Sequence, residues 1–244
     1  VVLKRLNLTW KGAELMEVSL PFYQDLQQEL GVAADHPLPI LRLLHSPAEQ
    51  NAWAEASDRP GLEDFLLPQR IPNTNPGIEA PHGFGRVRGA GWMDTALLLN
   101  TWAEKEASDG RLRRERFDHQ ALAFSGGQWE YKDVQARKII FCQGFGMRQN
   151  PWFDYLPLQG TKGEYLTIHA PDLKEDRIIK ASVFLIPLGR DRYRVGATYA
   201  WNDFSNEPTT AAREQLLEKV RRFLRCAFRI TRQTAGIRPT VPDR

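Results

Sequence analysis

Cysteine and long hydrophobic runs are scarce in this 244-residue chain, and each scarcity excludes a class of protein. Cys142 and Cys226 are the only cysteines, so neither a disulfide framework nor a cysteine-rich metal site is expected. No apolar run reaches the length of a transmembrane helix, and the longest ones, such as Ala181–Leu188, have the length of a strand. No basic, apolar and small-residue signal sequence opens the chain. These features predict a protein of the reducing cytoplasm that has no membrane span.

Catalytic motifs of several large enzyme classes are also missing. The sequence has no Gly-x-Ser-x-Gly, no His-Glu-x-x-His and no Gly-x-x-x-x-Gly-Lys-Ser/Thr, which argues against common hydrolases, zinc proteases and P-loop enzymes. The histidines are scattered, so no metal site is predicted. They are His36, His45, His82, His119 and His169.

Net charge is small, at +3, which by itself does not call for a nucleic-acid partner. The segment Lys219–Arg232 is nevertheless rich in arginine. Apolar residues recur through it at helical spacing, from Leu216 to Leu224, so the arginines fall on the opposite face. We interpret this face as solvated, with contact to phosphate or RNA as the alternative.

Helical patterns dominate the first half of the chain. Residues 13–30 predict a helix that ends at Gly31, and Pro21 should either kink this helix or mark a restart. Ser46, Pro47 and Glu49 form a capping box that begins the next helix. A tract rich in proline and glycine follows over 59–91, with a short strand at 85–88, and a third helix is expected over 93–107. That helix is predicted to bury three side chains, namely Leu97, Leu98 and Trp102.

Strand patterns dominate the second half. They are expected at Phe117–Phe124, Gln128–Tyr131, Ala136–Gln143, Glu164–His169, Ala181–Leu188, Arg192–Ala197 and Ile230–Arg238. A hairpin should join two of them at 188–191, and a helix should run from Thr210 to Phe228. Helices first and antiparallel strands after indicate an α+β fold.

Two glycine pairs come near to the dinucleotide-binding fingerprint without matching it. Gly83-Phe84-Gly85 has Arg88 where the third glycine is required. Gly144-Phe145-Gly146 follows the apolar run Ile139–Cys142, but its third position is Gln149 and Pro151 rules out a long helix there. Neither is a pyrophosphate loop. The second is either an ordinary turn or a place where the backbone approaches a ligand.

The segment around Arg238 carries the most information about function. Pro239 biases Arg238 toward extended backbone and is predicted to end the strand. An arginine fixed at the end of an apolar strand suits a carboxylate, which it can hold through two parallel hydrogen bonds. The alternative is a surface arginine in a salt bridge.

In chain order these segments resemble the D-amino-acid oxidase and glycine oxidase group of flavoproteins, over almost the whole chain. Ile139–Gly146 is similar to the family's apolar strand that ends in glycines at the FAD, and Leu158–Leu166 to its strand into the substrate domain. Val183–Pro187 and Tyr193–Thr198 resemble the paired strands over the flavin. Gly236-Ile237-Arg238-Pro239 with Asp243 resembles the closing Gly-x-Arg-Pro signature.

The resemblance implies an α/β FAD-binding domain, present in part, and a substrate domain with a mostly antiparallel sheet. It assigns 1–60 and 92–147 to the first, 61–91 and 148–229 to the second, and 230–244 to a return strand toward the FAD-binding domain. It implies hydride transfer to FAD from a small amino or imino acid.

Site residues follow from the same resemblance. Arg238 corresponds to the arginine that grips the substrate carboxylate, with Phe184 and Tyr199 beside it; no catalytic base is assigned. The expected FAD contacts are Phe117, Gly144, Phe145, Gly146, Gly236 and Ile237.

The chain also departs from the family pattern. No Gly-x-Gly-x-x-Gly loop precedes Val1 and no glycine-rich flavin segment follows Arg244, so we expect these residues alone to bind FAD poorly and to be inactive. Phe184 replaces a tyrosine whose hydroxyl helps to hold the carboxylate, a loss of about 1 kcal/mol. Oxidation of an amine on a larger molecule such as modified tRNA, or a non-catalytic binding module, are the alternatives.

Overall fold

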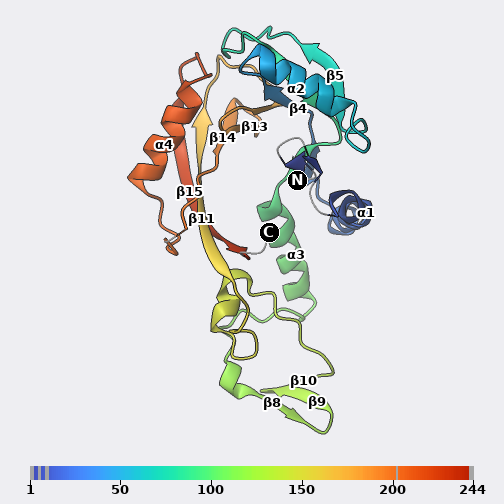
Figure 1. Ribbon diagram of the computed structural model, residues 1–244. Coiled ribbons are helices and arrows are strands. Elements are labelled where there is room, and N and C mark those ends of the chain that lie inside the picture. Colours follow the sequence, from blue (N-terminus) through green and yellow to red (C-terminus); the bar gives the residue numbers. More distant parts are fainter. Residues whose placement is uncertain (1–2, 5–6, 9–10, 202, 242–244) are drawn as a thin grey trace.

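An eight-stranded sheet forms the centre of the computed structural model, which describes residues 3–4, 7–8, 11–201 and 203–241 (Figure 1). Its strands are β4 (Ile40–Leu43), β5 (Leu66–Ile71), β6 (Phe84–Val87), β11 (Gln159–His169), β12 (Ile178–Lys180), β13 (Phe184–Pro187), β14 (Arg192–Gly196) and β15 (Arg229–Thr240). Their order is β15-β11-β14-β13-β12-β4-β6-β5. Neighbours run antiparallel except β12 and β4, which are parallel. Helices and a mostly antiparallel sheet confirm the predicted mixed fold class.

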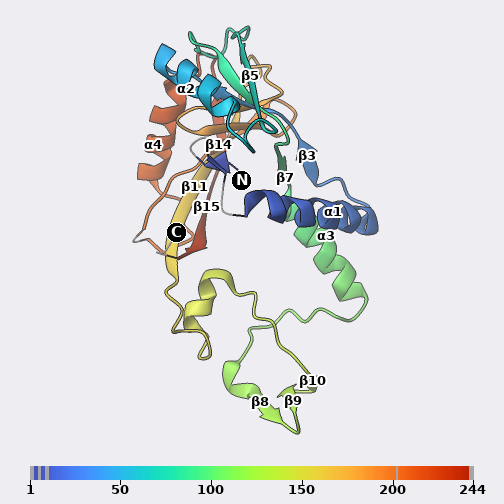
Figure 2. The same cartoon turned by 45° about the vertical axis from the view of Figure 1, so that its right-hand side comes forward.

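Four α-helices and several short elements surround this sheet. The helices are α1 (Gly12–Leu30), α2 (Pro47–Ser57), α3 (Thr95–Ser108) and α4 (Thr210–Arg221). Two small ribbons pair β1 (Leu3–Lys4) with β2 (Asn7–Leu8) and β3 (Asp35–Pro37) with β7 (Gly91–Met93). A lower lobe holds β8 (Leu122–Ser125), β9 (Gln128–Tyr131), β10 (Val134–Ala136) and the 3-10 helices η1 (His119–Ala121) and η2 (Gly144–Gln149). Figures 1 and 2 both place this lobe below the main body.

Strand alternation gives the central sheet two unlike faces. One face is the main core, where α4 packs on apolar side chains that include Leu166, Ile168, Leu185, Val195, Leu216 and Val220. The other face we call the open face. Across its middle the register aligns Arg42, Lys180, Phe184, Gly196, Tyr165 and Thr234. Tyr165 on β11 and Arg194 on β14 are half-buried on this face, and Gly163 and Gly196 interrupt its side chains.

Helix α2 covers the β5–β6 end of the open face. Its Trp53 is 2% exposed and its ring lies where a Cβ on Gly85 would stand, so only glycine fits at that point of β6. The Trp53 indole N–H donates to the carbonyl of Leu67 at 2.8 Å. The predicted cap that starts this helix is confirmed, since Ser46 Oγ accepts from the Glu49 N–H.

The prediction of a strand over Ala136–Gln143 is wrong beyond its first residue. β10 ends at Ala136, and the following residues run without a strand partner to η2. An extended segment forms a strand only when a neighbour pairs with its N–H and C=O groups, and no described strand lies beside this one. Ile140 is accordingly 84% exposed.

The helix predicted to reach Phe228 ends at Arg221 instead. Tertiary contacts stop it: the Phe223 carbonyl accepts from the Glu79 N–H at 2.7 Å, and Leu224 forms a β-bridge with Ile78. Both Phe223 and Leu224 turn into the main core. Their apolar spacing therefore reflects a buried turn after the helix as well as a helix face.

Three other local predictions need correction. Pro21 lies within a helix that spans Gly12–Leu30 as one element and so does not mark a restart, and Gly31 ends that helix with a φ of 65°. In α3, Leu98 is buried, whereas Leu97 and Trp102 are 40% and 42% exposed. The strand expected from Phe117 begins only at Leu122, because Asp118 caps η1 through the N–H of Gln120.

Pro239 does not end its strand, contrary to the prediction. β15 is an edge strand, and it continues through Pro239, which lies in register with Gly160, to Thr240. A proline lacks the N–H of a ladder, but at an edge that N–H would face away from the sheet. Arg238 therefore lies two residues before the end of β15, whereas the sequence predicts it as the last residue of the strand.

Candidate functional site

The guanidinium of Arg238 lies on the open face, at the edge of the sheet. It stands 4.8 Å from the centroid of the Tyr199 ring and directly over Gly163, where the Cβ of any other residue would overlap it. Among the described residues it forms neither a hydrogen bond nor an ion pair, so the surface salt bridge considered as the alternative is not formed there. Asp243, the last residue of the signature, lies outside the described residues. Arg238 is thus held by stacking, with its N–H donors available.

Two buried polar atoms on the same face also lack a partner. In the part of the chain that the structure describes, Arg194 Nε and Thr234 Oγ1 are the buried side-chain nitrogen and oxygen atoms without a hydrogen bond. They flank Tyr165, because Thr234 is its register partner and the Arg194 guanidinium lies 4.6 Å from its ring centroid. An unsatisfied buried polar atom costs about 1–3 kcal/mol. A polar ligand on the open face would remove that cost.

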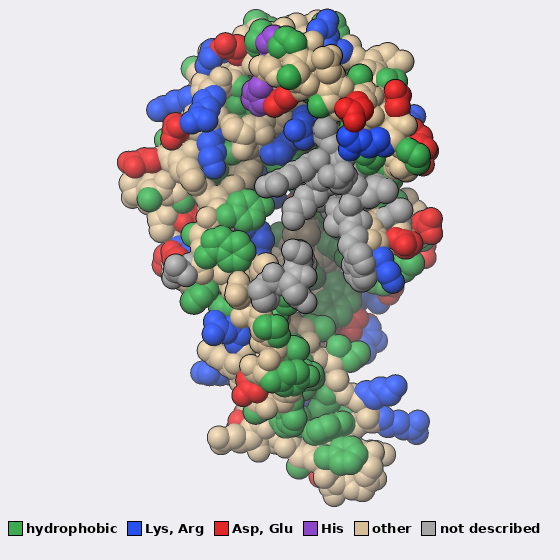
Figure 3. Space-filling model, viewed as in Figure 1, with side chains coloured by type: hydrophobic (Ala, Val, Ile, Leu, Met, Phe, Trp, Pro, Cys, Tyr) green, Lys and Arg blue, Asp and Glu red, His purple; other side chains and the backbone are tan. Residues whose placement is uncertain are grey.

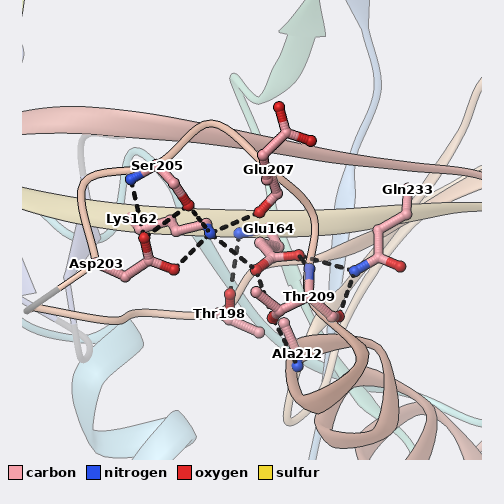
Figure 4. A network of polar contacts seen from close by, with 9 residues as sticks. All are labelled: Lys162, Glu164, Thr198, Asp203, Ser205, Glu207, Thr209, Ala212 and Gln233. Carbon is pink, nitrogen blue, oxygen red and sulfur yellow. Dashed lines mark hydrogen bonds and ion pairs between the residues drawn. The ribbon is translucent and has the colours of Figure 1, made fainter.

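Beneath Arg238, on the α4 side of the sheet, lies a network of polar contacts around Lys162 (Figure 4). The Lys162 side chain is 1% exposed, and its Nζ donates to Asp203 Oδ2 at 2.6 Å and to Ser205 Oγ at 2.9 Å. It also donates to the Glu207 carbonyl at 2.6 Å. All three acceptors belong to the loop that leads into α4, so the ammonium fixes this loop to β11.

Glu164 holds the other end of the same loop. Its carboxylate accepts from the N–H and the hydroxyl of Thr209, the N-cap of α4, and from Gln233 Nε2 on β15. Its own N–H donates to Thr198 Oγ1 at 2.9 Å. Lys162 and Glu164 therefore tie β11, β15 and the loop together directly below Gly163, the residue on which Arg238 rests. The network thus fixes the residues of β11 on either side of Gly163.

One member of the network has a strongly shifted pKa. Hydrogen bonds to its carboxylate, first from Lys162 and then from Ser205, lower the pKa of Asp203 to about 2. These bonds favour the ionised form, because the protonated acid could not accept all of them. The carboxylate therefore stays charged at every physiological pH.

An aromatic contact anchors η2 near the same end of the sheet. The rings of Phe145 and Phe204 lie 5.1 Å apart, and both would overlap a Cβ on Gly160. The Arg148 guanidinium lies 5.5 Å from the Phe145 ring centroid. Gly144–Gly146 is thus a 3-10 turn packed beside β15, and Gly144 adopts a φ of 56°.

The structure brings together some of the predicted site residues and separates others. Arg238 and Tyr199 are in contact, and Gly236 is on their face with no described atom within 4 Å of the place of a Cβ. Ile237 alternates to the opposite face, in register with Lys162. Phe184 is on the open face three strands from β15, under the Lys180 ammonium, which lies 4.5 Å from its ring centroid.

Phe117 lies apart from these residues, in the lower lobe. Its ring stacks on Tyr131 at 4.3 Å and meets Phe141 edge-on at 5.8 Å, in a cluster that also includes His119 and Trp152. Hydrophobic side chains are correspondingly frequent on the lobe in Figure 3. Whether Phe117 contacts FAD stays a prediction that rests on the resemblance.

Sequence reasoning missed Lys162 and Glu164. A signal for them exists: two charged residues at i and i+2, in a segment whose next alternate positions are the apolar Leu166 and Ile168. On a strand these positions share one face, so the charges had to be buried together. Only the partners from the loop 203–209 and from β15 show how they are stabilised.

Charges on α4 are partly neutralised within the protein. Arg222 forms an ion pair with Glu218, and Arg225 with Glu79. Arg213 donates to the side chain of Gln233. Whether this basic face is solvated or contacts nucleic acid stays a prediction.

A cavity lies away from Arg238, on another part of the molecule. It has a volume of about 1210 Å³ and is bounded by the β3–β7 ribbon, the start of α3, residues 172–177 and the hairpin after β13. Within the described ranges, no cluster of histidine, cysteine, aspartate and glutamate could hold a metal ion. In the same part of the chain, no helix is long and apolar enough to cross a membrane.

Comparison with known proteins gives one family. The model of the DAO family, described as FAD dependent oxidoreductase, matches residues 5–244.

Solved structures of the same fold are numerous. Glycine oxidase from Geobacillus kaustophilus is 15% identical with a TM-score of 0.71, over 95% of this chain and 67% of that one. Glycine oxidase from Bacillus cereus ATCC 14579 is 15% identical with a TM-score of 0.73, over 93% and 67%. Iminodiacetate oxidase from Chelativorans sp. BNC1 is 16% identical with a TM-score of 0.69, over 95% and 68%. The chain thus spans about two thirds of each, and at this identity the likeness establishes the fold alone.

Proposed function

The chain belongs to the DAO family of FAD-dependent oxidoreductases, and on that premise we propose that it oxidises a small amino or imino acid whose carboxylate Arg238 holds. The observation that carries this proposal is the guanidinium of Arg238, which is stacked on Tyr199 over Gly163 and has no acidic partner among the described residues. An arginine whose fork is positioned but unpaired is suited to a planar carboxylate, which it can bind through two parallel hydrogen bonds.

The open face fits a flavin ring on two observations. The place of a Cβ at Gly236, beside Arg238, has no described atom within 4 Å, whereas at Gly163 and Gly196 that place is met by Arg238 and Tyr165. Arg194 Nε and Thr234 Oγ1 offer buried polar atoms without partners. We propose that these residues face the ring, with Gly144–Gly146 of η2 at its side. Bound FAD would supply the redox chemistry by accepting a hydride from the carbon that bears the amine.

The residues of this chain would bind and orient the substrate. Arg238 would fix the carboxylate, and Tyr199 would keep the guanidinium in place from its other side. A substrate that binds with a neutral amine needs no base from the protein, and we assign none. The names of the structural relatives support a small amino or imino acid, since glycine and iminodiacetate are both amines that bear a carboxylate.

Two further parts of the proposal rest on the sequence. No Gly-x-Gly-x-x-Gly loop occurs within these 244 residues, so we propose that they hold FAD weakly and are inactive by themselves. The assignment of 1–60 and 92–147 to an FAD-binding domain, and of 61–91 and 148–229 to a substrate domain, also stays a prediction.

Arg238→Met in the full-length protein, as encoded by its gene, tests the proposal. We expect yellow, FAD-containing protein in both forms, because Arg238 is assigned to the substrate. Loss of a charged hydrogen-bonding partner corresponds to about 2–3 kcal/mol, so KM for carboxylate-bearing amines should rise about 30-fold or more. Arg229→Met, an exposed arginine of the same strand, is the matched control.

Amines that lack a carboxylate supply the second control. Their KM should be nearly the same in the wild type and in Arg238→Met, since nothing is left for the guanidinium to hold. An equal rise for both substrate classes would disprove the anchor role. A folded full-length protein that contains no flavin would disprove the oxidoreductase proposal as a whole.

A further inference from the structure

Two cations stand side by side on the open face, far from Arg238. Lys180 on β12 is in register with Arg42 on β4, four and five strands from β15. Adjacent strands are about 4.8 Å apart, and register partners point to the same side of the sheet. Like charges directly opposite one another destabilise a sheet unless something compensates for them.

No described acidic side chain compensates for this pair. The Lys180 ammonium donates to the carbonyl of Ala181 at 3.1 Å and lies over the Phe184 ring. The Arg42 side chain forms no hydrogen bond or ion pair within the described ranges. Burial of Lys180, and then the charges of Arg42 and Lys219, lower the pKa of its ammonium. Both side chains are half-buried, so water screens their repulsion incompletely.

The central register between these cations and β15 carries no acidic side chain. Its floor consists of Phe184, Gly196 and Tyr165, which follow Lys180 across β13, β14 and β11. On the far side of Arg42 the row is closed by Trp53, which covers Gly85. Cationic groups therefore stand at both ends of this floor, and a third, the Arg194 guanidinium, lies within it, 4.6 Å from the ring centroid of Tyr165.

We propose that Arg42 and Lys180 form a second anion-binding position, which receives an acidic group at the far end of the substrate whose carboxylate Arg238 holds. This inference rests on the proposed function. The Arg238 guanidinium lies over Gly163 on β11, and three strand spacings, about 14 Å, separate β11 from β12. Gly163 is also two residues, about 7 Å, along the strand from the row that contains Lys180. The long Lys180 side chain shortens that gap. The second acidic group should therefore lie several bonds from the first, as in an extended amino or imino dicarboxylate or an amine that ends in a phosphate.

Calorimetric titration of the full-length, FAD-containing protein tests this without turnover. The probes are the dicarboxylates glutarate, adipate and suberate, the monocarboxylate hexanoate, and inorganic phosphate. We expect one dicarboxylate to bind about tenfold or more tightly than hexanoate, the size of a charged hydrogen bond. Lys180→Met and Arg42→Met should each remove most of that advantage and leave the Kd of hexanoate unchanged.

Arg86→Met is the matched control, because Arg86 is an exposed arginine of the neighbouring strand β6, in register with Leu41 and so on the opposite face. It should change neither Kd. Lys180→Met removes the repulsion between Lys180 and Arg42. The melting temperature of this variant should therefore equal or exceed that of the wild type, so the variant should fold. A dicarboxylate advantage that survives in both variants overturns the proposal.

Two other results separate this inference from the proposed function. If Arg238→Met weakens hexanoate and dicarboxylates alike while the Lys180 and Arg42 variants change nothing, the carboxylate anchor stands and the second position is refuted. If phosphate binds in a way that depends on Lys180 but does not compete with any dicarboxylate, the cations serve a separate phosphate site, which overturns the link to the substrate.

Discussion

At the scale of single residues, the absence of a side chain at Gly163 decides where Arg238 can lie. The guanidinium occupies the space of a Cβ, with the Tyr199 ring on its other side. Below the same glycine, Lys162 and Glu164 are buried and fixed by several hydrogen bonds. The seat of the arginine is therefore rigid, although the arginine itself forms no polar contact with described residues.

Gly163→Ala should accordingly impair substrate binding without unfolding the protein. The three atoms nearest to the new methyl group belong to the flexible end of Arg238, which can move away, so we expect a change in melting temperature of about 2 °C or less. The displaced guanidinium should raise KM for carboxylate-bearing amines about tenfold, or ~1.4 kcal/mol.

Gly236→Ala is its control, since no described atom lies within 4 Å of the new methyl group. It should leave Arg238 in place and KM for the carboxylate nearly unchanged, although it can lower the affinity for FAD if the ring lies there. Equal KM values for the wild type and Gly163→Ala would show that the position of Arg238 over this glycine has no role in binding.

At the scale of elements, the loop 203–209 is held to β11 by the Lys162 ammonium. Asp203 is the acidic partner, and its pKa of about 2 lies below the usual 3.8 of an aspartate because Lys162 donates to it. A carboxylate with a lowered pKa stabilises the folded state above its unfolded pKa. That contribution is lost as the pH falls from about 4 to about 2, where the native carboxylate also takes up a proton.

Asp203→Asn should therefore lower the urea midpoint at neutral pH, and the difference from the wild type should shrink as the pH falls through this window. Urea unfolding at several pH values from about 6 to about 2 measures it.

Asp133→Asn is the comparison, because Asp133 has a pKa of about 2 for a similar reason, its pairing with Arg113, but lies in the lower lobe. It should not change the midpoint of the main sheet. A difference between Asp203→Asn and the wild type that stays constant down to pH 2 would contradict the ion-pair account.

At the scale of the whole molecule, the main body and the lower lobe differ in how much they bury. The main core joins β4, β11–β14 and α4, whereas no residue between 123 and 149 is buried. The lobe is held by aromatic ring contacts and by exposed ion pairs such as Lys132 with Glu115. Exposed ion pairs contribute little to stability.

Amide hydrogen exchange should therefore show two levels of protection in this chain. We expect amides of β8–β10 to exchange through local opening, and those of β11 and β14 to exchange only on global unfolding. Exchange followed by mass spectrometry at increasing urea measures both. If the amides of the lobe and of the sheet exchanged with the same free energy of opening, the two parts would form one cooperative unit.

The sequence by itself determined the elements whose signals are local. Glycine ends α1, Ser46 caps α2, and alternation identifies β14 because each of these depends on residues close in the chain. The ordered motifs that close with Arg238-Pro239 also identified the family, now shown by its model.

Tertiary structure decided what depends on partners distant in the chain. Ile139–Cys142 is apolar enough for a strand but has no described neighbour to pair with, and Pro239 stays in a strand because β15 lies at an edge. The lysine network and the Arg42–Lys180 pair join residues more than 40 and 130 positions apart. No local pattern encodes such a juxtaposition, since it arises from the order in which the strands are laid side by side.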